Sequence, residues 1–184
     1  MIAVFTTLIA FNVRGCFGSL RESFHHSLFQ VASIITTTGF STVDFNQWPA
    51  FSKLLLVLLM FIGASPGSTG GGIKTSTFFV IFQEIRGMCT KKTVHAFHRS
   101  ISRQNVSKAF MITILSGTVV GIAVFLMCIL EPDFSFMQLF FEVISAFGTV
   151  GLSTGITPDL SVAGKAVIIL VMFTGRVGGV HPAV

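Results

Sequence analysis

Residues 145–153 read SAFGTVGLS, a short apolar run that ends in a bend rich in Gly, Thr and Ser. A related bend, TTTGFST, occupies residues 36–42. The two bends coincide when the chain is shifted by 112 positions, and the register holds over more than thirty residues without a gap. Repetition at a fixed offset indicates two copies of one structural unit. The other matching stretches are LFQVAS (28–33) with FFEVIS (140–145), and MFIG (60–63) with MFTG (172–175).

The composition excludes a water-soluble domain. Of the 184 residues, 52% are hydrophobic and only 10% are charged, and the mean hydropathy is +0.84. Soluble domains carry about 25% charged residues, because a surface in contact with water needs ionisable side chains. The 21 Phe residues, with no Tyr, also suit contact with lipid or a densely packed apolar interior. We therefore predict an integral membrane protein.

Apolar runs of different lengths predict the helices. Residues 109–130 are 22 residues without a charge, long enough to cross a hydrocarbon core of about 30 Å. Residues 24–35 and 134–147 are too short to span and are predicted as re-entrant half-helices. Residues 53–82 are apolar but are interrupted by SPGSTGGG at 65–72, where Pro and Gly oppose helix formation. The predicted fold is all-α, with two parallel units of helix, half-helix, bend and helix.

Basic residues are concentrated in one loop and predict the orientation of the chain. Six of the twelve Lys and Arg residues lie between residues 84 and 108, flanked on both sides by apolar stretches. The positive-inside rule makes this a cytoplasmic loop, and its position between membrane segments argues against nucleic-acid binding. Glu131 and Asp133 precede the second half-helix on the opposite, outer side. Both bends are therefore predicted to enter the membrane from outside.

The chain divides into a first unit at 1–83, the cytoplasmic basic loop at 84–108 and a second unit at 109–184. The first and last helices are predicted to be truncated. Residues 1–11 are about half as long as a spanning helix, and the last apolar run, at 164–184, begins like a crossing and then stops. We expect a partial chain from a split, truncated or frameshifted gene. It would depend on a missing N-terminal half or on a second copy, as in a homodimer.

The two bends have the composition of a cation site. Backbone that is neither helix nor barrel persists at membrane depth only where it is buried in protein or lines water. Gly permits the backbone angles that turn successive carbonyls to one side, and a row of carbonyls can replace the hydration shell of a monovalent cation. Thr149-Val150-Gly151 also matches the start of the TVGYG filter of K⁺ channels. The alternative is that both bends only cap half-helices in a non-conducting membrane protein.

Four motifs resemble one family in their order along the chain. TTTGFST, SPGSTGGGIK, SAFGTVGLS and MFTGR are similar to the third and fourth repeats of the Trk/Ktr/HKT superfamily of potassium transporters, over most of residues 24–178. The resemblance implies a K⁺-channel-like fold of four helix–pore-loop–helix units around one pathway. It also implies that K⁺ binds to the backbone carbonyls of a filter. The filter residues would be Thr37, Thr38, Gly39, Phe40, Thr149, Val150, Gly151 and Leu152.

The resemblance further implies a gate below the filter, formed by the Gly-rich segment as a flexible intramembrane loop. The alternative is a passive kink. Arg176 lies eleven residues beyond the interfacial Lys165, hence roughly 16 Å deep at about 1.5 Å per residue, where an ionisable side chain is a functional hypothesis by default. Its expected partners are the carbonyls of residues 70–72 or a carboxylate in the absent half, and its alternative is snorkelling. The gate residues would be Gly67, Gly70, Gly71, Gly72, Lys74 and Arg176.

Glu142, like Arg176, is an ionisable residue in a segment predicted to lie within the membrane, where a charge is costly. It lies in the second half-helix, at the position that Gln30 occupies in the first. Hydrogen bonding behind the filter is favoured over direct contact with an ion.

The predicted function is K⁺ uptake through the plasma membrane, the inner membrane of a bacterium, driven by a potential worth about 2.3 kcal/mol per charge per 100 mV. K⁺ is the transported substrate and no cofactor is predicted. The resemblance implies a cytosolic nucleotide-binding regulatory ring as a partner. An enzyme is not predicted, because Ile73 precedes Lys74 and Ser68 replaces the other Gly of a P-loop. The alternatives are a non-conducting membrane fragment, or a Na⁺-selective or Na⁺/K⁺ transporter of the same family.

Overall fold

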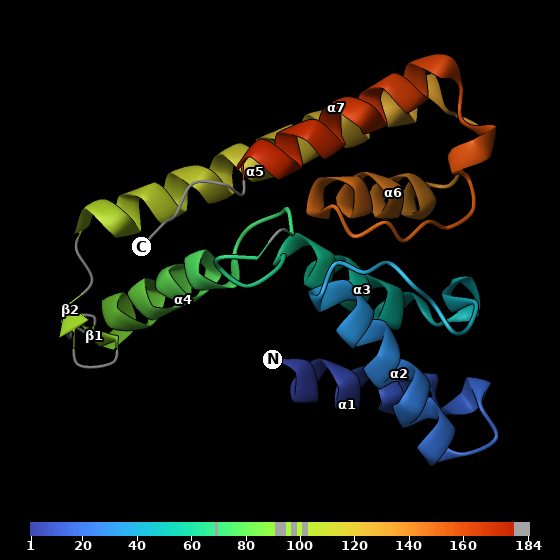
Figure 1. The fold of residues 1–184 in the computed structure, drawn as a ribbon, viewed down its shortest axis with the longest axis horizontal. Helices are drawn as coiled ribbons and strands as arrows, with labels where there is room; N and C mark the ends of the chain where they lie inside the picture. Colours follow the sequence, from blue (N-terminus) through green and yellow to red (C-terminus); the bar gives the residue numbers. More distant parts are fainter. Residues whose placement is uncertain (69, 91–94, 97–98, 101–102, 179–184) are drawn as a thin grey trace.

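The computed structural model describes residues 1–68, 70–90, 95–96, 99–100 and 103–178 (Figure 1). Helices dominate it, in agreement with the predicted class. The elements in chain order are α1 (Ile2–Asn12), η1 (Val13–Cys16), α2 (Leu20–Ile35), η2 (Phe45–Gln47), α3 (Ala50–Phe61), α4 (Thr75–Thr90), β1 (His95–Ala96), β2 (Arg99–Ser100), α5 (Arg103–Leu130), α6 (Phe136–Gly148), η3 (Thr157–Asp159) and α7 (Val162–Gly178).

The same order of elements occurs twice. A helix, a second helix, a turn, a short 3₁₀ segment and a third helix appear as α1, α2, η2 and α3, and again as α5, α6, η3 and α7. Within the second group α6 and α7 pack together and both contact α5, while α3 joins the groups through α6. In Figure 1 the long α5 and α7 lie alongside each other, with α6 between them and α3. The turns after α2 and α6 therefore come together at the centre.

Local sequence explains where the two inner helices begin. The side chain of Ser19 accepts a hydrogen bond from the Glu22 N–H at 3.2 Å and starts α2. Ser135 and Gln138 form a capping box that starts α6. Because Ser19 is an effective cap, α2 begins four residues before the predicted residue 24. The apolar α3 ends at Phe61, and Gly63 follows with a positive φ of 48°, so the apolar stretch at 53–82 is not one continuous helix.

The predicted loop at 84–108 contains the ends of two helices. Helix α5 begins at Arg103, six residues before the uncharged run at 109–130, and α4 extends to Thr90. The two-residue strands β1 and β2 pair antiparallel between these helices.

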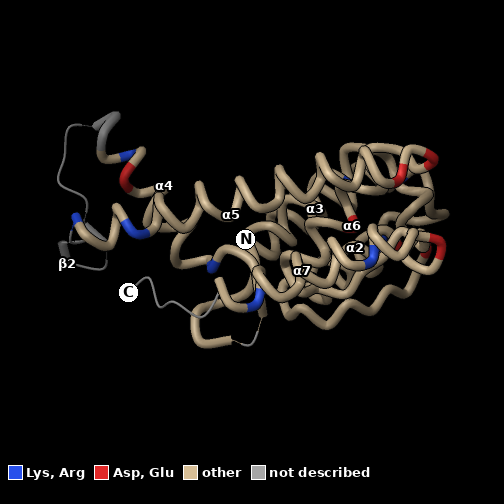
Figure 2. The backbone as a smooth tube through the Cα atoms, turned by 90° about the horizontal axis from the view of Figure 1, so that it is seen from above, with Lys and Arg blue, Asp and Glu red and all other residues tan. Residues whose placement is uncertain are grey.

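Among the described residues, α5 alone is long and apolar enough to cross a membrane by length and composition. Three shorter apolar helices cover Ile2–Cys16, Ala50–Phe61 and Phe136–Gly148. Figure 2 shows Lys and Arg gathered around β2 and the start of α5, and most Asp and Glu at the opposite end of the molecule. This polarity along α5 follows the charge pattern from which the orientation was predicted.

Candidate functional site

The turns after α2 and α6 have the same unusual backbone. Thr37 and Thr149 both lie in the left-handed region, at φ 54° and 53°, and are the only non-Gly residues with positive φ in the described part of the chain. Gly39 and Gly151 follow two residues later with φ 76° and 86°. A left-handed Thr is costly and persists only where its surroundings hold it. The repeat found in the sequence therefore extends to the individual backbone angles.

The amides of both turns are bonded in the same way. Thr37 and Thr38 donate N–H groups to the carbonyls of Ile34 and Ser33, at 3.0 and 2.9 Å. In the second turn the corresponding bonds of Thr149 and Val150 reach Ala146 and Ser145 at 3.1 and 3.0 Å. Within the described residues no hydrogen bond is donated to the carbonyl oxygens of residues 37–39 or 149–151. Each turn thus presents three successive oxygens with free acceptor capacity.

The two turns lie directly against each other. A side chain at Gly39 would overlap the carbonyl oxygen of Val150 and come within 3.3 Å of the Gly151 α carbon. The same position at Gly151 has nothing within 4 Å. Phe40 is 69% exposed, whereas its counterpart Leu152 is 3% exposed. One side of the second turn is therefore covered by the first unit, and the equivalent side of the first turn is open.

Glu142 holds the second turn from behind. It is buried, and its Oε1 accepts hydrogen bonds from the Ser153 hydroxyl at 2.6 Å and from the Thr154 amide and hydroxyl at 2.8 and 3.1 Å. Its Oε2 accepts from the Thr157 hydroxyl at 3.1 Å. In the first unit the side chains of Gln30 and Ser41 make the equivalent contact at 3.1 Å. The expected hydrogen bonding of Glu142 is present, and all four of its donors belong to the residues that follow the turn.

The Gly-rich loop between α3 and α4 packs against both turns. A side chain at Gly70 would lie 2.9 Å from Cγ2 of Thr37, and one at Gly71 would lie 2.9 Å from Oγ1 of Thr149. The Gly71 amide donates to that Thr149 hydroxyl at 2.7 Å. Gly72 has a φ of 75° and packs against Gly63, whereas Gly67 is exposed with nothing within 4 Å of its side-chain position. Gly70 and Gly71 thus contact the site, and Gly67 does not.

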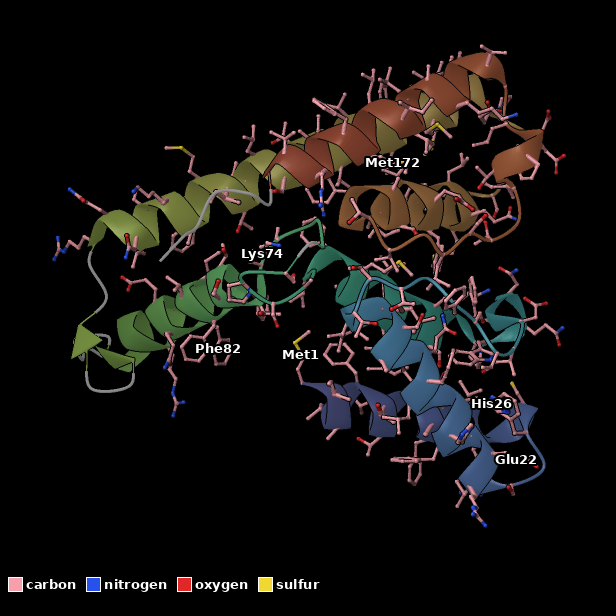
Figure 3. All side chains as sticks on the ribbon, in the orientation of Figure 1. Met1, Glu22, His26, Lys74, Phe82 and Met172 are labelled. Atoms are coloured by element: carbon pink, nitrogen blue, oxygen red, sulfur yellow. The ribbon has the colours of Figure 1, made fainter. Side chains whose placement is uncertain are left out.

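Lys74 connects the end of the Gly-rich loop to its middle by hydrogen bonds. Its ammonium donates to the carbonyls of Gly70 at 2.6 Å and Ser68 at 3.3 Å. Figure 3 shows Lys74 where the loop returns to α4. Arg176 follows Gly175, whose α carbon packs against the Phe147 carbonyl at the end of α6. Lys74, and not Arg176, binds the Gly70 carbonyl. The predicted bonds from Arg176 to the carbonyls of residues 70–72 are not formed among the described residues.

The outer loops use the same lysine bond in both units. Lys53 donates to the Asn46 carbonyl at 3.2 Å, and Lys165 donates to the Pro158 carbonyl at 2.8 Å. Asn46 Nδ2 donates to the Thr154 carbonyl at 3.2 Å and so ties the loops together. Asp44 accepts from the Asn46 amide and from the Gln47 side chain, and these bonds hold the pKa of its exposed carboxyl below the ordinary value.

The two predicted turns lie against each other, with Gly70 and Gly71 beside them and Gly67 apart from them, but several hydrogen-bond partners were not predicted from the sequence. The bonds from Lys53 and Lys165 to loop carbonyls could have been predicted from the sequence, since the two lysines occupy equivalent positions in the repeat. The left-handed Thr37 and Thr149 gave no such signal, because Thr rarely adopts this conformation. The four donors around Glu142 lie 11 to 15 residues away in sequence, and no local pattern links them.

Comparison with known sequences identifies relatives over almost the whole chain. A family model described as TrkH, cation transport protein, matches residues 3–184. Ktr system potassium uptake protein B of Bacillus subtilis (strain 168) is 39% identical over 97% of this chain and 40% of its own length. The protein of the same name from Vibrio alginolyticus is 43% identical over 83% of this chain and 33% of its length. Potassium/sodium uptake protein NtpJ of Enterococcus hirae is 38% identical over 77% of this chain. The chain spans about two-fifths or less of the length of these relatives.

A solved structure has the same fold. The potassium transporter TrkH from Vibrio parahaemolyticus matches with a TM-score of 0.80 and 24% identity, over 97% of this chain and 41% of that one. At this identity the likeness supports the arrangement of helices and turns described above.

Proposed function

Because the chain belongs to the TrkH family of cation transport proteins, we propose that it conducts K⁺ into the cell through a filter built from the turns at 37–40 and 149–152. The family is one of membrane transporters rather than enzymes. The transported ion is the substrate, and no cofactor is required. Residence in the bacterial inner membrane and several membrane crossings are parts of this proposal.

The pairing of the two turns carries the proposal. They repeat the same backbone angles, lie against each other, and offer the free carbonyl oxygens of residues 37–39 and 149–151. A K⁺ ion stripped of water needs several such oxygens at once. Turns that served only to cap half-helices would not need to repeat each other or to leave three successive acceptors open, and that supports a conducting role.

Two turns provide only part of a ring, and the open surfaces indicate where the remainder belongs. The exposed Phe40 side of the first turn and the uncovered Gly151 side of the second correspond to surfaces that are covered where the turns meet. We propose that further units with the same turn fill both positions, with 1–83 and 109–184 acting as the third and fourth of four. They come from an N-terminal half or a second copy. A homodimeric assembly and a nucleotide-binding ring on the side of residues 84–108 complete the proposed transporter.

Uptake of K⁺ tests this function directly. The matched region of the Bacillus subtilis relative is replaced by this chain, and the chimera is expressed in cells that lack K⁺ uptake. We expect growth at low K⁺ and saturable uptake of Rb⁺, with weaker uptake of Na⁺. The chain alone is assayed in parallel. A chimera that reaches the membrane in folded form but takes up neither ion would favour the non-conducting alternative.

We further propose that the loop at 65–74 is the gate, because Gly70 and Gly71 contact the two turns on one side. Replacing Lys74 by Met should release this loop, since it removes the hydrogen bonds to Gly70 and Ser68 while keeping the length of the side chain. A bond to a charged donor contributes about 1.5–3 kcal/mol, and about 1.36 kcal/mol corresponds to a factor of ten, so initial Rb⁺ uptake should rise by about tenfold or more. Lys165→Met is the matched control, because that lysine also donates to a backbone carbonyl, that of Pro158, but lies near the start of α7, away from the Gly-rich loop. Unchanged or slower uptake in Lys74→Met contradicts the gate.

Arg176 is proposed to add a cationic barrier at the same level. Its neighbour Gly175 packs against the Phe147 carbonyl at the end of α6, directly before the second turn. Arg176→Ala should raise uptake per folded transporter by several-fold, since each 1.4 kcal/mol of barrier removed corresponds to about tenfold in rate. Arg176→Lys keeps the charge and should remain slow. Equal uptake by both variants, measured with Rb⁺ in proteoliposomes, would show that the charge plays no such role.

A further inference from the structure

The seam enclosed by α1, α2 and α3 contains polar groups that the site described above does not use. Thr6, Ser27 and Gln30 are each 0% exposed. The Thr6 hydroxyl, the Ser27 hydroxyl and the Gln30 Nε2 have no hydrogen-bond partner among the described residues. Burying a polar group without a partner costs about 1–3 kcal/mol. Three such groups in one seam, near the first turn, require an explanation.

The hydroxyls of Thr6 and Ser27 do not form the hydrogen bond that Ser and Thr commonly form within a helix. Ser and Thr in a helix commonly donate to the carbonyl four residues earlier. Ser23, Thr113 and Thr118 do so in this chain, at 3.1, 3.0 and 2.8 Å. Thr6 and Ser27 lie in equally regular helices but direct their hydroxyls elsewhere. A hydrogen-bonding partner inside the seam would explain why neither hydroxyl bonds the carbonyl four residues earlier.

Gln30 cannot be satisfied by protein in either orientation of its amide. The Ser41 hydroxyl lies within hydrogen-bond distance of both the Gln30 Oε1 and the Val43 carbonyl, but it has a single proton. If that proton goes to Gln30, Nε2 is left without a partner. If it goes to Val43, the amide must turn so that Nε2 donates to Ser41, and Oε1 is left instead. One end of this amide is therefore always without a partner among the described residues.

The second unit has no such deficit. Glu142, the counterpart of Gln30, has both oxygens bonded. Ser27 corresponds to Leu139, which is 1% exposed, so the first unit carries a side chain shorter by two heavy atoms at the position that Leu fills in the second. Ser27 and Gln30 are three residues apart and share one face of α2. Among the described residues, the first unit alone thus combines a smaller side chain with unpartnered polar groups on the same helix face.

We infer that this seam binds one or two ordered water molecules, held by Thr6, Ser27 and Gln30. Water can donate or accept, and it needs two to four polar partners, which matches an amide of either orientation and two hydroxyls. Two hydroxyls and one amide, without a carboxylate among them, are too few ligands for a metal cation. Since the three side chains are already fully enclosed, polypeptide outside these residues is not needed to shield the site. The water links α1 through Gln30 to Ser41 and so to the first turn.

Thermal unfolding of the purified full chain in lipid nanodiscs tests the inference, because the direction in which the unfolding midpoint shifts differs between a hydroxyl that binds water and one that does not. If Thr6 holds water, Thr6→Val removes a used hydrogen bond, and the midpoint should fall by about 2–4 °C. If the hydroxyl is simply unpartnered, the same substitution removes a buried polar group and the midpoint rises. Ser27→Ala should behave like Thr6→Val. Ser23→Ala is the matched control, because Ser23 lies on the same buried face but its hydroxyl is bonded to the Ser19 carbonyl.

Solid-state NMR supplies a measurement that does not depend on stability. With ¹⁵N-labelled Gln, magnetisation transfer from water should reach a buried side-chain amide that is assigned to Gln30 by its loss in Gln30→Leu. This transfer should be at least halved in Thr6→Val. The inference is overturned if no magnetisation is transferred from water to the Gln30 amide of the wild-type chain, or if the unfolding midpoint rises in Thr6→Val. Neither readout involves ion transport, so failure of the proposed function would leave this test unaffected.

Discussion

Gly39→Ser is expected to reduce K⁺ uptake by the chimeric transporter at least tenfold and to weaken its preference for K⁺ over Na⁺. Gly39 has a φ of 76°, and a side chain there would overlap the Val150 carbonyl. The left-handed conformation costs a non-Gly residue about 1–2 kcal/mol, and the overlap is with backbone that cannot rotate away. The first turn can then relax only by moving the carbonyls of the second, which is the change that ion preference should detect.

The equivalent substitution in the second turn, Gly151→Ser, separates the effect of backbone strain from that of steric overlap with the other turn. Gly151→Ser has a similar backbone strain at φ 86° but meets nothing within 4 Å in the described structure. It should keep more uptake than Gly39→Ser while still weakening K⁺ discrimination. Gly117→Ser on α5 is the control, because its side-chain position is open and its φ is not positive. Competition between Rb⁺ and Na⁺ measures all three variants. Normal ion preference in both turn variants would remove the filter assignment.

The repeat explains how much of the site the sequence could predict. Offset matching placed Gly39 opposite Gly151, and both adopt positive φ as Gly at a bend should. The same matching placed Gln30 opposite Glu142, and both bond the Ser that follows the turn. The positive φ at both Gly positions could be predicted because it rests on local conformation, which similar sequences reproduce in both units. The Ser partners of Gln30 and Glu142 could not, because they lie eleven residues away.

The remaining features depend on contacts between segments that are distant in sequence. The bond from Gly71 to Thr149 spans 78 residues, and no periodicity or composition signals it. The interaction of Lys74 with Gly70 was missed because a lysine beside a Gly-rich loop was read as part of the gate without a partner, and Arg176 was assigned those carbonyls instead. The start of α5 at Arg103 was also missed, since a membrane span is recognised by its apolar residues and a helix can extend beyond them into water.

Replacing Glu142 by Leu should abolish K⁺ uptake, with a fall of a hundredfold or more. The carboxylate is 5% exposed and accepts hydrogen bonds from Ser153, Thr154 and Thr157. Hydrogen bonds to a charged group contribute about 1.5–3 kcal/mol each, so losing two of them already corresponds to about a hundredfold at 1.36 kcal/mol per factor of ten. Leu would also leave buried donors unpaired behind the second turn. The assay is Rb⁺ uptake per folded chimera.

Glu142→Gln distinguishes the two roles that a buried carboxylate can have near a cation path. Oε1 alone accepts the bonds from Ser153 and Thr154, and only Thr157 reaches Oε2. Gln keeps an oxygen at the first position and removes the charge, as Gln30 already does in the first unit. Uptake within about threefold of the unsubstituted chimera is therefore expected, because the turn keeps its support. If Gln were as damaging as Leu, the negative charge itself would be acting on the permeating ion, and the carboxylate could no longer be assigned to holding the turn alone.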